Sequence, residues 1–114
     1  MSKEPAIDKK VMATLKEIMA EDFEALIPVF YSSFDEIMSE LETAYVEANL
    51  EDFLRQAHSL KSSCANLGCL VLRDLASALE LQAKQGQIPD SLQFLPVLRE
   101  EFARVQLEMA EYTR

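Results

Sequence analysis

The residues best suited to chemistry lie in one short segment around His58, the single histidine of the chain. A neutral imidazole is a nucleophile near pH 7. Lys61 follows three residues later on the same side of a helix, where its ammonium could stand beside an anion carried by the ring. Ser62 and Ala65 are small, so another protein could approach the ring closely. The segment therefore suits phosphorylation of His58, with an ordinary surface histidine as the alternative interpretation.

A helix over about residues 51–67 is expected to position this segment. Asn49 interrupts the preceding apolar pattern, acidic residues occupy the first turn, and Gly68 is a credible C-terminal cap. At about 100° per residue, one buried stripe is predicted. It comprises Phe53, Ala57, Leu60 and Cys64, with Leu67 beside them. His58 lies to one side of this stripe, so we expect a partly exposed ring on the shoulder of the helix.

The rest of the chain is predicted to be helical as well, because it contains only two glycines and four prolines and is rich in helix-favouring residues. Apolar periodicity indicates helices over about 8–20, 22–48 and 71–85, and from 91 to the C-terminus. The stripes expected in the first and last of these are Val11, Leu15, Ile18 and Met19, and Leu92, Leu95, Leu98, Phe102, Val105, Leu107 and Met109. Long helices with short connections predict an all-α fold, an antiparallel four-helix bundle with an additional N-terminal helix.

Length and charge narrow the class of protein. A chain of 114 residues is expected to form one domain, residues 1–114. Twenty acidic and eleven basic side chains give a net charge of -9, which disfavours nucleic acid and anionic membranes as partners. The sequence has neither a run of apolar residues long enough to span a bilayer nor a recognisable export signal, so we expect a cytoplasmic protein.

Several other kinds of site are disfavoured. Cys64 and Cys69 lie five residues apart, where a disulfide would need unusual geometry, so both are expected to be reduced. One histidine and two neighbouring cysteines do not make a four-ligand zinc site. Glycine occurs only at positions 68 and 86, which leaves no glycine-rich loop to hold a nucleotide. We therefore expect that the protein does not use ATP itself.

The segment around His58 resembles the signature of histidine-containing phosphotransfer (HPt) domains. In that signature the histidine is followed by any residue, Leu, Lys and a small residue, and a Gly lies ten residues after the histidine. The matching positions here are His58, Leu60, Lys61, Ser62 and Gly68. The likeness covers nearly the whole chain, since a long amphipathic helix precedes the segment and a helix containing Leu79 and Glu80 follows it, as in bacterial members.

The resemblance implies a role for each matching residue. His58 would be phosphorylated, Lys61 would stabilise the phosphoryl group, and Glu80 would orient the ring through its other nitrogen. A solvated charge is the alternative interpretation of Glu80. Many family members have Gly in place of Ser62, and this departure could alter which partners fit or how quickly they exchange phosphate.

The same resemblance implies a place in a multistep two-component phosphorelay. The chain would accept a phosphoryl group from a phospho-aspartate on the receiver domain of a hybrid sensor histidine kinase and pass it to a response-regulator receiver. It would be a phosphoryl carrier and not an independent enzyme, with Mg²⁺ supplied by the receiver and no cofactor of its own. We expect a freestanding monomer.

A non-transferring helical adaptor that docks receiver domains is the alternative function. Either function needs a docking surface on the exposed side around His58, and intact His58 and Lys61 favour the carrier. The residues expected on that surface are Leu54, Ser62, Ala65 and Leu67, with Leu70 as a further candidate.

Overall fold

The computed structural model describes residues 4–113, and this part of the chain contains five α-helices, one turn of 3-10 helix and no strand. Residues 1–3 and 114 of the predicted domain lie outside the described residues. The elements are α1 (Lys9–Met19), the 3-10 turn (Ala20–Asp22), α2 (Phe23–Val46), α3 (Leu50–Asn66), α4 (Leu70–Lys84) and α5 (Phe94–Met109). Within this part of the chain, no helix combines the length and apolarity needed to cross a membrane.

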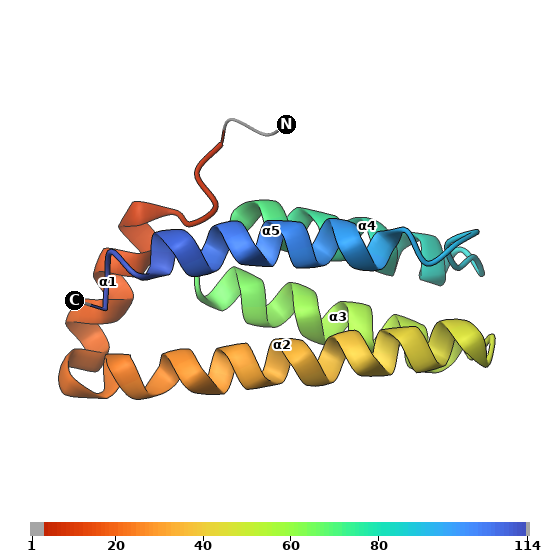
Figure 1. Cartoon of the computed structure of the whole chain (residues 1–114), viewed down its shortest axis with the longest axis horizontal. Coiled ribbons are helices and arrows are strands. Elements are labelled where there is room, and N and C mark those ends of the chain that lie inside the picture. Colours follow the sequence, from red (N-terminus) through yellow and green to blue (C-terminus); the bar gives the residue numbers. More distant parts are fainter. Residues whose placement is uncertain (1–3, 114) are drawn as a thin grey trace.

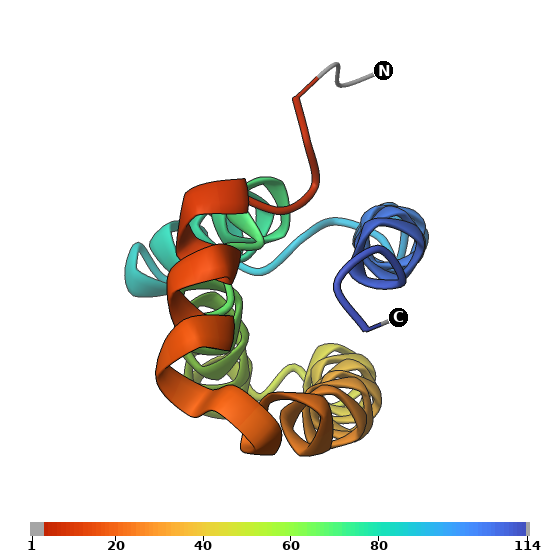
Figure 2. The same cartoon turned by 90° about the vertical axis from the view of Figure 1, so that its left-hand side faces the viewer.

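Helices α2 to α5 form the bundle, each running antiparallel to the next along its long axis (Figure 1). The end view shows the four helices at the corners of the bundle, with α3 between α2 and α4 and with α5 diagonally across from α3 (Figure 2). Helix α1 crosses one end of the bundle. The prediction of an antiparallel four-helix bundle with an additional N-terminal helix is confirmed.

Local signals set the helix ends nearest the site. Asp8 caps α1 by accepting backbone hydrogen bonds at 2.8 and 3.2 Å, and Asn49 caps α3 by accepting one at 3.0 Å. Gly68 follows α3 with φ of 72°, in the left-handed region that glycine adopts without a side-chain clash. Its carbonyl accepts a 2.7 Å hydrogen bond from the backbone N–H of Asp8. This bond joins the start of α1 to the connection between α3 and α4.

The predicted buried stripe of α3 is confirmed. Its buried residues are Phe53, Ala57, Leu60 and Cys64. Leu92, also predicted on the stripe of the last helix, is 37 % exposed and precedes α5. The predicted stripes of the first and last helices are also wrong for Ile18 on α1 and Leu107 on α5, which are both 76 % exposed. Each lies about 120–140° around its helix from a buried residue, Met12 and Phe102 respectively. The contact faces of these two helices are therefore narrower than their apolar stripes.

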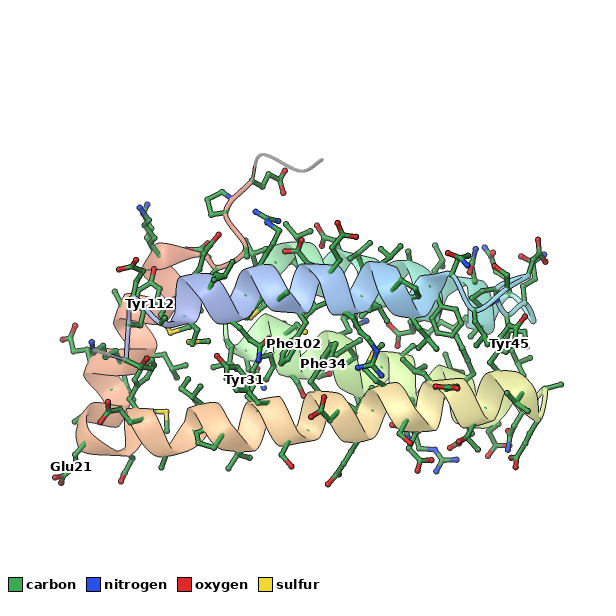
Figure 3. The ribbon with its side chains drawn as sticks, viewed as in Figure 1. Glu21, Tyr31, Phe34, Tyr45, Phe102 and Tyr112 are labelled. Atoms are coloured by element: carbon green, nitrogen blue, oxygen red, sulfur yellow. The ribbon has the colours of Figure 1, made fainter. Side chains whose placement is uncertain are left out.

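Aromatic rings join α2 to α5. The rings of Phe34 and Phe102 stack with centroids 3.7 Å apart and planes 3° from parallel. Tyr31 meets Phe102 edge-on at 5.4 Å, and Figure 3 shows these side chains between the two helices. Edge-on pairs such as Tyr31–Phe102 contribute about 0.5–1.5 kcal/mol beyond burial of their area. They hold α5 against α2, on the side of the bundle away from the α3–α4 pair.

The last helix is shorter than predicted. It begins at Phe94 and not near Ser91, because the preceding residues form a turn in which Leu95 N donates to Leu92 O at 3.0 Å. No side chain caps its start, so the sequence carries no local signal for that boundary. Pro96 is the third residue of α5, where the N–H that proline lacks would have no partner within the helix.

Candidate functional site

Helix α3 presents His58 at the edge of its buried stripe. The side chain of His58 is 60 % exposed, whereas the neighbouring Ala57 and Leu60 are fully buried. The burial of these neighbours sets the rotation of α3 about its axis. The predicted position of the ring on the shoulder of the helix is therefore confirmed.

Glu80 of α4 lies against the ring of His58. The Nδ1 atom of His58 and the Oε2 atom of Glu80 are 2.6 Å apart. The side chain of Glu80 is only 5 % exposed, because it lies on the face of α4 that packs into the bundle. The interpretation of Glu80 as a solvated charge is wrong, since this carboxylate is buried and paired.

Two lysines also meet this carboxylate. The Lys61 ammonium pairs with Oε1 of Glu80, and Nζ of Lys84 lies 3.8 Å from Oε2. The hydrogen bond from Lys61 is the main cause that holds the pKa of Glu80 below its ordinary value, and His58 and Lys84 act in the same direction against the opposing effect of burial. Glu80 is therefore ionised at neutral pH.

The ionised carboxylate determines which ring nitrogen of His58 carries the proton. A carboxylate can only accept hydrogen bonds, so Nδ1 of His58 must donate to Glu80. In a neutral ring, Nε2 then keeps its lone pair. The arrangement yields a nucleophilic nitrogen on an exposed ring whose other nitrogen is held in place.

The surface around His58 leaves room for a partner. Ser62 and Ala65 are exposed and Leu54 is partly exposed, as the predicted docking surface requires. Leu67 is only 4 % exposed, and its assignment to that surface is wrong. It lies nine residues after His58, about half a turn around the helix axis, and its side chain packs into the core.

Other reactive side chains lie away from this cluster. Cys64 and Cys69 are free and buried, and burial raises the pKa of Cys69 to about 12. Neither thiol is ionised at neutral pH, so both behave as core residues. Among residues 4–113, no group of three or more His, Cys, Asp and Glu side chains is placed to hold a metal ion.

Lys84 is the member of the cluster that the sequence analysis missed. A weak signal for it exists, because Glu80 and Lys84 are four residues apart in the order that favours an ion pair on a helix. That signal occurs on many solvent-exposed helix faces. It gains meaning only when the structure places Glu80 in the interior beside His58.

Comparisons with known proteins agree with this architecture. A sequence model of the Hpt domain family matches residues 25–108, which include His58, Lys61 and Glu80. The phosphorelay protein LuxU of Vibrio vulnificus, from strains YJ016 and CMCP6, is 29 % identical over 85 residues, covering 75 % of this chain and 74 % of LuxU. The crystal structure of histidine-containing phosphotransfer protein B (HptB) from Pseudomonas aeruginosa PAO1 shares the fold, with a TM-score of 0.89, 24 % identity and coverage of 97 % of this chain and 96 % of that one. The chain belongs to the Hpt domain family, whose function is histidine phosphotransfer in two-component signalling.

Proposed function

We propose that this protein accepts a phosphoryl group on Nε2 of His58 from a phospho-aspartate in the receiver domain of a hybrid sensor kinase, and passes it to a response-regulator receiver. The observation that carries the proposal is the 2.6 Å contact between Nδ1 of His58 and the buried carboxylate of Glu80. A ring held at one nitrogen, with a lone pair at the other, is oriented for nucleophilic attack.

The proposed transfer needs no proton movement within this chain. The Nε2 lone pair attacks phosphorus, and the N–P bond forms as the P–O bond to the aspartate breaks, which releases the aspartate as a carboxylate. The ring keeps its hydrogen on Nδ1 and becomes positively charged. Glu80, 2.6 Å away, would balance that charge. Transfer to the second receiver is the same step in reverse.

Lys61 is assigned to stabilising the phosphoryl group. It lies one turn after His58, and its side chain is 31 % exposed. Negative charge on the transferred group is spread over three oxygens in the transition state, where an ammonium is attractive. The same ammonium binds Oε1 of Glu80, so the phosphoryl oxygens and Glu80 would compete for Lys61.

The partner proteins would supply the remaining catalytic groups. The receivers would supply Mg²⁺, and this chain would use neither ATP nor a cofactor of its own, because its glycines offer no nucleotide-binding loop. We further propose that the carrier acts as a monomer in the cytoplasm. The similarity to LuxU, which is named a phosphorelay protein, supports a relay between signalling proteins.

The first experiment is incubation of the purified protein with a phosphorylated receiver domain, Mg²⁺ and no ATP. We expect an acid-labile, base-stable label on the wild type and none on His58→Gln. Lys61→Ala should take up label more slowly than the wild type. Label retained by His58→Gln would disprove the proposed site, and binding of several receivers without any label would favour the adaptor function.

A further inference from the structure

Glu80 has two potential lysine partners, which differ in their distance from the carboxylate and in the exposure of their side chains. The Lys61 ammonium, from α3, is bound to Oε1, and Lys61 is 31 % exposed. Lys84, from α4, is 57 % exposed, and its Nζ lies 3.8 Å from Oε2, within ion-pair range but beyond hydrogen-bonding distance. Lys84 therefore stands beside a carboxylate that Lys61 already binds.

Phosphorylation of His58 would change which lysine is available to pair with Glu80. If Lys61 turns to the phosphoryl group on His58, Glu80 loses its closest cation. The positive ring would still pair with Oε2, but Oε1 of this carboxylate, which is only 5 % exposed, would lose the ammonium that binds it, and that loss is unfavourable. The same carboxylate must stay ionised, because it balances the positive ring of the phosphorylated histidine.

We propose that Lys84 replaces Lys61 on Glu80 when His58 is phosphorylated, and so acts as a positioning residue for the phosphohistidine. This inference rests on the proposed function. Lys84 follows Glu80 by four residues on the same helix, the order that favours such a pair, and its exposed side chain is free to shorten the 3.8 Å separation.

Charge balance supports the replacement of Lys61 by Lys84 on Glu80. A phosphoryl group brings about two negative charges, and the phosphorylated ring is positive. With Lys61, Lys84 and Glu80 included, the phosphorylated cluster is formally neutral. Without Lys84, Glu80 would keep neither of its two ammonium partners once Lys61 binds the phosphoryl group, which disfavours the phosphorylated state.

The test is the equilibrium of phosphoryl exchange between this protein and a receiver domain. Lys84→Gln should move that equilibrium toward the phosphorylated receiver by about two- to fivefold, the range expected for one partly exposed ion pair. Lys84→Arg should restore it. Lys10→Gln, which removes the same charge from an exposed position on α1, is the matched control and should leave it unchanged.

A second pair of variants separates the replacement of Lys61 by Lys84 from a general effect of charge. In a Lys61→Gln background, Lys84 would pair with Glu80 both before and after phosphorylation, so adding Lys84→Gln should change the equilibrium by less than about twofold. A through-space attraction between Lys84 and the phosphoryl group would instead give the same effect in both backgrounds. That result would overturn the proposed replacement of Lys61 by Lys84 on Glu80.

The outcomes distinguish this inference from the proposed function. If the wild type takes no label on His58, both fail. If the wild type is labelled and Lys84→Gln behaves like Lys10→Gln, the role of Lys84 alone is wrong. Circular dichroism of each variant confirms that the helices are intact.

Discussion

Nδ1 of His58 and Oε2 of Glu80 lie 2.6 Å apart, although 22 positions separate these residues in the sequence. They meet because α3 and α4 are antiparallel neighbours joined by a short connection at Gly68. This helical hairpin holds His58, Lys61, Glu80 and Lys84. Helices α2 and α5 lie on the other side of the bundle and contribute to the core behind it.

Replacing Glu80 should slow transfer without removing the nucleophile. We expect Glu80→Ala to lower the single-turnover rate about 10- to 100-fold, as is typical when the partner that orients a reactive ring is lost. Glu80→Gln keeps an oxygen that can accept from Nδ1 but lacks the charge that balances the phosphorylated ring, so its rate should be intermediate. Glu100→Ala, at an exposed position on α5, is the control. If Glu80→Ala transfers at the wild-type rate, the orienting role of Glu80 is wrong.

Acid should remove the contribution of Glu80 to stability. Because the hydrogen bond from Lys61 lowers the pKa of Glu80 below 4.5 in the folded protein, the unfolded chain takes up a proton first as the pH falls. The contribution is complete above the unfolded pKa and is lost as the pH falls through the lower folded pKa. We therefore expect the difference in free energy of unfolding between wild type and Glu80→Gln to be constant near neutral pH and to shrink below pH 4.5. Urea denaturation across that range measures it, and a difference that grows on acidification would contradict the assignment.

The parts of the fold that the sequence predicted depend on local signals. Asp8, Asn49 and Gly68 mark helix ends through their own hydrogen bonds or backbone angles, and the stripe of α3 follows from helical periodicity. The pairing of Glu80 with His58 depends on the register of α3 against α4, which no local pattern encodes. The likeness to a known family suggested that pairing, whereas Lys84 had only a common helical spacing to indicate it.

Gly68 should be less tolerant of substitution than Gly86. Both have positive φ, 72° and 81°, so Ala at either position costs about 1 kcal/mol of backbone strain. A Cβ at Gly68 would also lie 2.9 Å from Cβ of Val11, whereas one at Gly86 meets nothing within 4 Å. We expect Gly68→Ala to lose about 1–3 kcal/mol more of the free energy of unfolding than Gly86→Ala. Equal losses in urea denaturation would show that α1 moves aside without cost.

A large side chain at Ser62 should block receivers while leaving the cluster intact. Ser62 is exposed one turn after His58, so Ser62→Arg would place a long side chain where a partner must approach. We expect binding and transfer to fall together, with a free energy of unfolding within about 0.5 kcal/mol of wild type. Titration with a receiver domain and the rate of label transfer measure the two effects. Ser62→Gly, which restores the more usual family residue, should bind and transfer at least as well as wild type.

Two matched variants make this test specific to the surface around His58. Gln106→Arg adds the same side chain to an exposed position on α5, diagonally across the bundle from α3, and should bind and transfer normally. His58→Gln keeps the surface but lacks the nucleophile, so it should bind receivers without accepting label. Because Ser62→Arg should do neither, the set separates loss of docking from loss of chemistry. Unchanged transfer by Ser62→Arg would mean that receivers reach His58 from another side of the ring.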